Sequence, residues 1–252
     1  MLSEPFAIGN SPIHRLDPRI RVVVAVIYAL VVAVCTTFPP LILAFSVAAG
    51  MICFAHLPAK TLLRRILLVN GFIGLFWVML PLTYGGTPLF RIGVVTISRP
   101  GVLFAALLTL KSNAILLSLI ALIATMPFVT LGQAMSRLYL PDKLVNLFLL
   151  TYRYIFVIEQ EYKRIMRAVK IRGFVPRTSF HTYKTYAYVV GMLFVRASER
   201  ADRVFAAMRC RGFKGRFYSL AGFRLTRASW LFAGLMTFIV LAIGILEWGP
   251  YG

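Results

Sequence analysis

Five long apolar segments constrain the fold of this chain more than any other feature. They are bounded by prolines, glycines or basic residues and cover roughly residues 18–35, 41–56, 66–82, 102–126 and 229–246. A helix of about 20 apolar residues crosses the ~30 Å hydrocarbon core of a bilayer. The chain is 60% hydrophobic and has a mean hydropathy of +0.81, which is more apolar than a soluble globular domain needs to be. The sequence therefore predicts an all-α, polytopic membrane protein with about five transmembrane helices.

Basic residues gather in one block between the fourth and fifth apolar segments. The net charge is +20, and residues 131–227 hold 19 of the 28 Lys and Arg but 5 of the 8 acids. Because cytoplasmic loops of membrane proteins are enriched in Lys and Arg, this block indicates a cytoplasmic region rather than a nucleic-acid-binding surface. Arg15, Arg19 and Arg21 at the start of the first segment place the N-terminus in the cytoplasm, and five crossings place the C-terminus outside.

The basic block is expected to contain two long helices, over about residues 142–171 and 183–210. Each begins apolar, over 144–158 and 186–197, and ends charged. The apolar halves are shorter than a typical span, so crossing the membrane and lying on its surface both stay open. A short amphipathic helix is expected over 131–140.

The same eleven-residue pattern occurs twice in this block. Residues 164–174 and 203–213 superpose at an offset of 39, which aligns their Arg, Ala and Arg-Gly-Phe positions. Positions i, i+4 and i+8 share one face of a helix, so a small alanine lies between two positive charges. We interpret the two segments as docking helices for a partner with acidic grooves. The residues concerned are Arg164, Ala168, Arg172 and Gly173, and Arg203, Ala207, Arg211 and Gly212.

Arg-Gly-Phe is also typical of a helix end. A cation suits the last turn, glycine takes the left-handed position beyond it, and the following apolar residue packs back. A helix end does not require a second arginine two turns earlier. Two copies with the same Arg-Ala-Arg face therefore favour docking, although the alternative stays open.

The N-terminal arm has the features of a helix start. Asp17 is a good N-cap, and Pro18 suits the first helical position. The predicted organisation is an arm over 1–17, four membrane helices over 18–126, a basic region over 127–227 and a last membrane helix over 228–252.

Catalytic and metal-binding motifs are missing from the sequence. It has no phosphate-binding glycine loop and no His-Glu-x-x-His, and its three histidines are isolated. The apolar segments also lack the acidic relay of a proton-coupled carrier. Lys111 lies inside the fourth segment, where snorkelling, pairing within the bundle and contact with a substrate all remain open. The sequence therefore indicates a membrane subunit without its own energy source, in a complex whose other subunits supply the energy.

Three features carry a resemblance to a known family. They are the arm Ser11-Pro-Ile-His14-Arg-Leu-Asp17-Pro18-Arg19, the segment Leu140-Pro141 with Thr151-Tyr-Arg153-Tyr154, and the paired Ala-x-x-x-Arg-Gly motifs. Over essentially its whole length the chain resembles the transmembrane T component of energy-coupling factor transporters, and within that family its cobalt branch, CbiQ.

The resemblance implies an importer of the bacterial inner membrane with divided labour. Two ABC-type, CbiO-like ATPase subunits hydrolyse ATP with Mg, and a CbiM-like membrane subunit, with a small CbiN-like subunit, captures the solute. The T component links them, is not itself an enzyme and binds no cofactor. Arg172 and Arg211 contact the ATPases, Ala168 and Ala207 allow close packing, and the glycines form the sharp exits. The supporting residues of the family pattern are Asp17, Pro18, Arg19 and Arg153.

The solute is the least defined part of this expectation. Cobalt is favoured, while nickel, biotin or another vitamin stay open, because the T component does not hold the solute. Two other classes of protein also compete with the coupling subunit. One is a stand-alone secondary carrier, and the other is a membrane scaffold or enzyme whose basic block binds anionic lipid.

Overall fold

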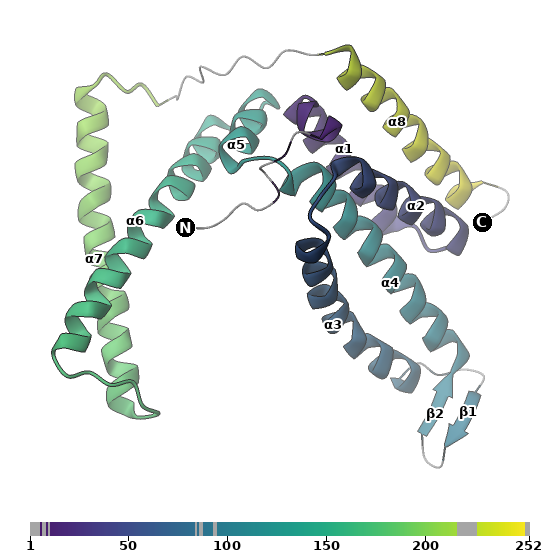
Figure 1. Ribbon diagram of the computed structural model, residues 1–252, viewed down its shortest axis with the longest axis horizontal. Helices are drawn as coiled ribbons and strands as arrows, with labels where there is room; N and C mark the ends of the chain where they lie inside the picture. Colours follow the sequence, from purple (N-terminus) through teal and green to yellow (C-terminus); the bar gives the residue numbers. More distant parts are fainter. Residues whose placement is uncertain are drawn as a thin grey trace. The chain divides into compact units, whose positions relative to one another are not determined.

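The computed structural model describes residues 6, 9, 11–83, 85, 88–92, 95–215 and 226–249 (Figure 1). Its elements are the 3-10 helix η1 (Pro12–Arg15), α1 (Pro18–Val34), α2 (Phe38–Ala55), α3 (Ala59–Thr83), β1 (Pro88–Ile92), β2 (Val95–Ser98), α4 (Arg99–Leu119), the π-helix η2 (Ile120–Ala124), α5 (Phe128–Arg137), α6 (Asp142–Ile171), α7 (Phe180–Cys210) and α8 (Arg227–Trp248). In these ranges one small hairpin accompanies the helices, so the all-α class is confirmed.

Contacts divide the chain into two compact units, which are described separately. The apolar unit comprises Leu2–Ala134 and Gly222–Gly252, and the basic unit comprises Met135–Ala221. The chain therefore passes from the apolar to the basic unit after Ala134, within α5, and returns at Gly222.

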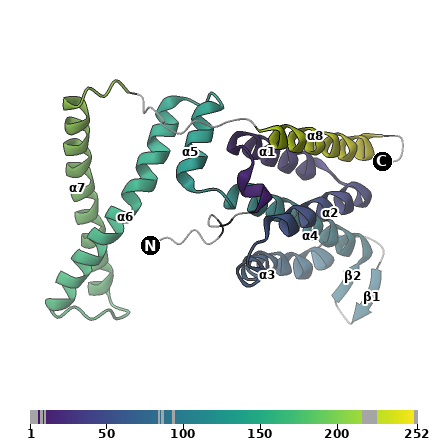
Figure 2. The same ribbon diagram turned by 45° about the horizontal axis from the view of Figure 1, so that its top comes forward.

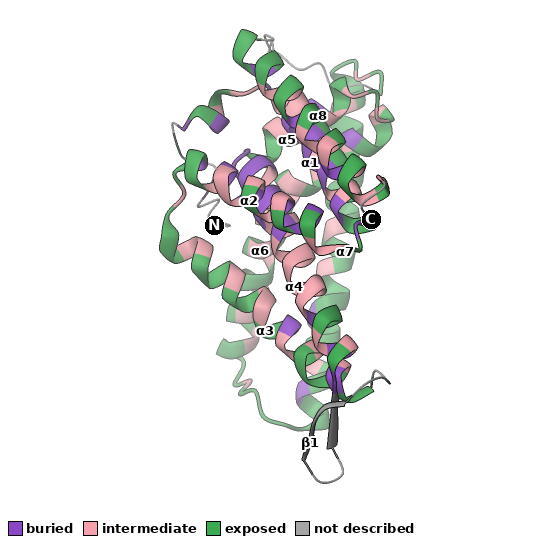
Figure 3. Ribbon diagram, turned by 90° about the vertical axis from the view of Figure 1, so that its right-hand side faces the viewer, coloured by how far each residue is buried: buried purple, intermediate pink, exposed green. Residues whose placement is uncertain are grey.

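Helices α1, α2, α4 and α8 lie side by side in the apolar unit (Figure 1, Figure 2). Alanines without exposed surface line their contacts, among them Ala25, Ala44 and Ala114. Small side chains let helices approach closely, which is the main source of packing in a membrane. Tyr28 is also fully buried, and its hydroxyl donates to the Ala44 carbonyl at 2.5 Å. Figure 3 shows buried positions on these packed helices, while α3 is mostly half-buried or exposed.

In the part of the chain that the structure describes, four helices are long and apolar enough to cross a membrane. They are α2, α3, α4 continued by η2, and α8. Their outward surfaces carry large apolar side chains such as Leu68 and Phe238, as a lipid-facing surface requires. The chain is thus a multi-pass membrane protein. α1 has 17 residues, at the short end of the spanning range, so the fifth crossing over 18–35 stays a prediction. The helices α6 and α7, which contain 144–158 and 186–197, are not among the four.

Several predicted boundaries are confirmed and others move. Asp17 caps α1, because its Oδ1 accepts from the Arg19 amide at 2.9 Å, and Pro18 is the first helical residue. α2 begins at Phe38 rather than near 41, since prolines in a first turn lose no helical hydrogen bond. α3 begins at Ala59 rather than near 66, and the short helix predicted over 131–140 is α5, three residues earlier. Between α3 and α4, β2 pairs antiparallel with β1.

Lys111 makes a contact inside the apolar unit. Its Nζ donates to the Ala33 carbonyl at 2.9 Å, in the last turn of α1, where the carbonyls lack helical partners. Just beyond the end of α1, the amides and hydroxyls of Thr36 and Thr37 donate to the Glu247 carboxylate. Of the alternatives for Lys111, this geometry supports pairing within the bundle.

Candidate functional site

The two long helices of the basic unit pack as an antiparallel pair. α6 spans Asp142–Ile171, as predicted, and α7 spans Phe180–Cys210, three residues longer at its start than predicted. The additional turn begins at Ser179, whose Oγ accepts from the Thr182 amide at 3.4 Å. Figures 1 and 2 both show α7 running back along α6 after the loop that joins them.

An ion pair joins the two helices where they meet. Glu161 on α6 accepts a short hydrogen bond from Arg196 on α7 and lies 3.6 Å from Arg164. The hydrogen bond from Arg196 is the main cause that lowers the pKa of Glu161. Only 13% of the Glu161 side chain is exposed. Sequence reasoning did not find this pair, because the two residues lie 35 apart on separate helices and share no motif.

Both predicted docking segments end in the same backbone structure. At the end of α6 the Phe174 amide donates to the Val169 carbonyl, and the Gly173 amide donates to the Lys170 carbonyl. Gly173 has a φ of +82°. These are the two bonds of a Schellman motif, in which the left-handed residue closes the helix.

The end of α7 repeats this arrangement. Phe213 donates to the Met208 carbonyl, Gly212 donates to the Arg209 carbonyl, and Gly212 has a φ of +75°. The helix-end interpretation of Arg-Gly-Phe is therefore confirmed for both copies. It does not oppose docking, because it fixes where each preceding arginine stands.

The Arg-Ala-Arg faces of the two segments are exposed. Ala168 and Ala207 are open to solvent, and so are the four arginines that flank them. The first arginine of each face has an acidic neighbour on its own helix: Arg164 lies 3.6 Å from Glu161, and Arg203 lies 3.8 Å from Glu199.

The second arginine of each face, Arg172 and Arg211, makes no ion pair with any residue that the structure describes. Each is the C-cap of its helix, a position at which the helix dipole favours a positive charge. These two guanidinium groups are therefore available to an external acidic group.

The two segments stand at opposite ends of α7. The first ends α6 and leads through a short loop to Phe180, while the second ends at the other end of α7, beyond Cys210. A helix of 31 residues is about 46 Å long, so the two arginine ends are far apart (Figure 1). One small partner surface cannot cover both.

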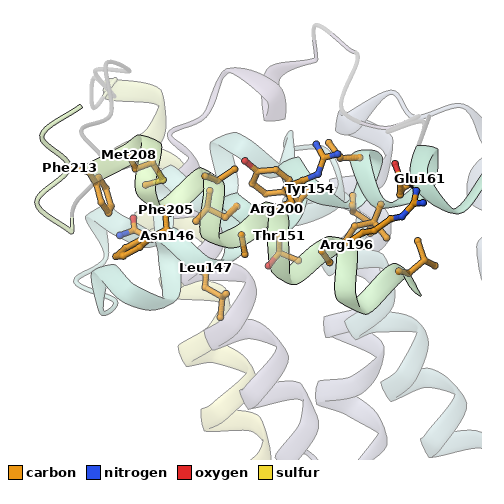
Figure 4. Close-up of a pocket in the computed structure, with 18 of the residues that line it drawn as sticks. Asn146, Leu147, Thr151, Tyr154, Glu161, Arg196, Arg200, Phe205, Met208 and Phe213 are labelled. Carbon is orange, nitrogen blue, oxygen red and sulfur yellow. Dashed lines mark hydrogen bonds and ion pairs between the residues drawn. The ribbon is translucent and has the colours of Figure 1, made fainter. Parts of the chain in front are cut away.

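A groove of about 630 Å³ lies between the first half of α6 and the second half of α7 (Figure 4). Its walls are mainly apolar, with Leu147, Val204, Phe205 and Met208 among the lining residues. The Asn146 side chain donates to the Gly215 carbonyl at 2.9 Å and holds the chain beyond α7 against the start of α6.

A second groove, of about 800 Å³, lies on the loop side of the helix pair. It is lined by the first docking segment, including Arg164, Ala168 and Arg172, and by residues of α7 such as Tyr188 and Met192. The first Arg-Ala-Arg face thus forms part of a concave surface.

The supporting residues lie in different parts of the chain. Asp17, Pro18 and Arg19 belong to the start of α1 in the apolar unit. Arg153 is exposed on α6, with its guanidinium carbon 5.9 Å from the centre of the Tyr154 ring. Among the described residues no group of three or more His, Cys, Asp or Glu is placed to hold a metal ion.

These features define a class: a multi-pass helical membrane protein with a basic helix pair whose two ends carry matching arginine faces. The family model described as "Cobalt transport protein", CbiQ, matches residues 9–220. The chain belongs to the CbiQ family.

Named relatives agree with this assignment. The chain is 27% identical over 265 residues to the energy-coupling factor transporter transmembrane protein EcfT of Leuconostoc gelidum, covering 96% of each chain. It is 26% identical to EcfT of Listeria innocua, covering 95% of this chain and 94% of the relative. It is also 32% identical over 147 residues to a putative fused cobalt transport protein CbiMQ of Methanocorpusculum labreanum, covering 55% of this chain and 24% of that one. The chain is thus a transmembrane component of the energy-coupling factor type.

Proposed function

We propose that this chain is the coupling subunit of an importer and transmits the movement of two ATPase subunits to a membrane subunit that binds the solute. The observation that carries the proposal is the pair of matching arginine ends on α6 and α7. Each presents an exposed alanine beside an arginine without an ion-pair partner in the described structure, and α7 separates them by its full length.

Each end suits one ATPase subunit. A guanidinium that docks on a carboxylate makes a directional contact, and truncating one partner of such a pair costs ~2–5 kcal/mol when it is buried at an interface. The exposed Ala168 and Ala207 leave room for that partner to approach. The Schellman motifs support this role because they fix the position of each arginine at its helix end.

The partners would share the remaining tasks. The two CbiO-like ATPases would bind ATP and Mg, and a CbiM-like subunit, with a CbiN-like one, would bind the solute. This chain would catalyse no reaction and bind no cofactor. The name of the fused CbiMQ relative supports a membrane partner of the CbiM kind. The basic unit would face the cytoplasm, with the N-terminus on that side and, given five crossings, the C-terminus outside.

Cobalt ion is the proposed solute. The description of the matching family and the name of the CbiMQ relative support it. Several relatives carry the more general name EcfT, so nickel, biotin and another vitamin are the solutes to compare in the same assay.

The test replaces Arg172 and Arg211 together by Glu in the assembled complex. We expect the variant to lose capture of the ATPases from detergent and to lose ATP-driven uptake of radioactive Co²⁺ in proteoliposomes. The matched control replaces Arg177 and Arg209 by Glu. These two exposed arginines lie outside the Arg-Ala-Arg faces, so this variant should retain ATPase capture and Co²⁺ uptake. Unchanged capture and uptake in the first variant would refute the proposal.

Replacement by lysine separates this function from its rivals. A bidentate docking arginine does not tolerate lysine, whereas a surface that binds anionic lipid through charge alone does. Uptake by this chain in the absence of ATPases, driven by an ion gradient, would instead support a secondary carrier.

A further inference from the structure

The start of α1 is hydrogen-bonded to two residues of the apolar unit, one that precedes the basic unit in the chain and one that follows it. Arg21 donates a short hydrogen bond to Thr125 Oγ1, and the Asp17 amide donates to Ser229 Oγ at 3.1 Å. Thr125 lies nine residues before Ala134, where the apolar unit is left, and Ser229 lies seven residues after Gly222, where it is re-entered. The start of α1 thus contacts the apolar unit both before and after the basic unit in the chain.

Arg21, which the sequence places at the entrance of the first apolar segment, is buried. Only 2% of the residue is exposed, its Nε has no hydrogen-bond partner, and it makes no ion pair with any residue in the described ranges. A buried charge without a carboxylate is usually less stable than an apolar side chain of similar size. Ionisable residues inside membrane bundles are functional candidates for this reason.

Thr125 gives Arg21 a specific target. It is 1% exposed and follows the π-helix η2, and its hydroxyl donates to the Ala121 carbonyl at 2.7 Å while accepting from Arg21. π-helices are rare, occur often at functional sites and close each backbone hydrogen bond over one residue more than an α-helix, i→i+5 instead of i→i+4. Conversion of η2 to α-helical bonding would turn the chain beyond Thr125 by about 100°, the rotation of one residue.

We propose that Arg21 is a positioning residue for energy coupling. Through Thr125 it holds η2 in its π register, and with the Asp17–Ser229 bond it ties both connections of the basic unit to α1. Movement that arrives along these connections is then delivered to the membrane helices instead of being absorbed at η2. This inference rests on the proposed function.

The test compares ATP hydrolysis with Co²⁺ uptake in proteoliposomes that contain the complete complex. The variants are Arg21→Met, Thr125→Val, which is isosteric but lacks the hydroxyl, and Thr125→Ser, which keeps it. Lys111→Met is the matched control, because it also removes a cation that makes a hydrogen bond between α1 and another part of the apolar unit, in this case between α4 and the other end of α1. Amide hydrogen exchange of residues 120–126 is measured in the same full-length variants.

We expect Arg21→Met and Thr125→Val to assemble and hydrolyse ATP within twofold of the wild type, with at least tenfold less Co²⁺ taken up per ATP. Exchange at residues 120–126 should be at least tenfold faster. Thr125→Ser and Lys111→Met should keep the uptake-to-ATP ratio within twofold. A merely structural Arg21 would lower uptake and hydrolysis together, and an unchanged ratio in Thr125→Val overturns the inference even if Arg21→Met fails to assemble.

Failure of the proposed function gives a different result. In that case the wild-type complex itself takes up no Co²⁺ and hydrolyses no ATP. Amide hydrogen exchange then tests whether Arg21 stabilises η2, independently of transport. Faster exchange at residues 120–126 in Arg21→Met supports this role, and unchanged exchange overturns it.

Discussion

Glu161 on α6 accepts a hydrogen bond from Arg196 on α7, and this ion pair joins the two long helices of the basic unit. The grooves on its two sides both include Arg196 among their lining residues. We expect the angle between the helices, and with it the positions of the two arginine ends, to depend on this contact.

Reversal of either charge should therefore loosen the helix pair, and reversal of both should restore it. We expect Glu161→Arg alone and Arg196→Glu alone to broaden the distance distribution between spin labels at the exposed positions Leu147 and Phe205. The double variant should narrow it again, because the pair is remade with opposite polarity. Equal broadening in the double variant would show that the pair does not set the helix angle.

The same pair predicts a dependence on pH. Hydrogen bonding from Arg196 lowers the pKa of Glu161 in the folded chain, so the carboxylate stabilises the helix pair at pH values above the unfolded pKa. That stabilisation is lost as the pH falls below roughly 4.3, through the lower folded pKa. Label distances recorded from pH 7 to pH 3 should broaden at the acid end. In Glu161→Gln the distribution of label distances should already be broad at pH 7 and should change less with pH.

The left-handed glycine at the end of α7 gives a third prediction. Gly212 has a φ of +75°, and a Cβ there would meet no atom within 4 Å, so Gly212→Ala is opposed by its backbone conformation alone, at a cost of roughly 1–2 kcal/mol. The last turn of α7 should exchange its amide hydrogens faster. Gly191→Ala, within the same helix and also free of neighbours, is the control and should stabilise α7 by roughly 0.5–1 kcal/mol. Similar exchange in the two variants would contradict the role of Gly212.

Larger side chains at the exposed alanines should weaken binding of the ATPases without changing the stability of this chain. Ala168→Leu and Ala207→Leu place side chains on open surface, so thermal unfolding of the subunit should change little. Binding of the ATPases should weaken at least tenfold, because the close approach is lost. Ala206→Leu, next to Ala207 and also exposed, should leave binding unchanged. A fall in binding with Ala206→Leu of the same size would argue against a specific face.

The sequence predicted those features that depend on local patterns. Long apolar runs located the membrane helices to within a few residues except at α3. Asp17-Pro18 located the start of α1, and Arg-Gly located both helix ends in the basic unit. Each signal acts through a nearby backbone group, so it can be read along the chain.

Other features could not be read in this way. The early start of α3 was missed because its first turns contain Lys60, Arg64 and Arg65 and so lie outside the apolar run, although Lys and Arg are good helix formers. The apolar pattern over residues 102–126 predicted a continuous helix and did not indicate the π-helix η2. The Glu161–Arg196 and Arg21–Thr125 contacts join residues on separate helices, and only the packing of those helices brings them together.

Native mass spectrometry of the nucleotide-free complex tests the central claim most directly, because it counts ATPase subunits on each copy of this chain. The account predicts two ATPases on the wild-type chain, one on Arg172→Glu, one on Arg211→Glu and none on the double variant. Two ATPases retained by both single variants and by the double variant would contradict the claim that each arginine end binds one ATPase subunit.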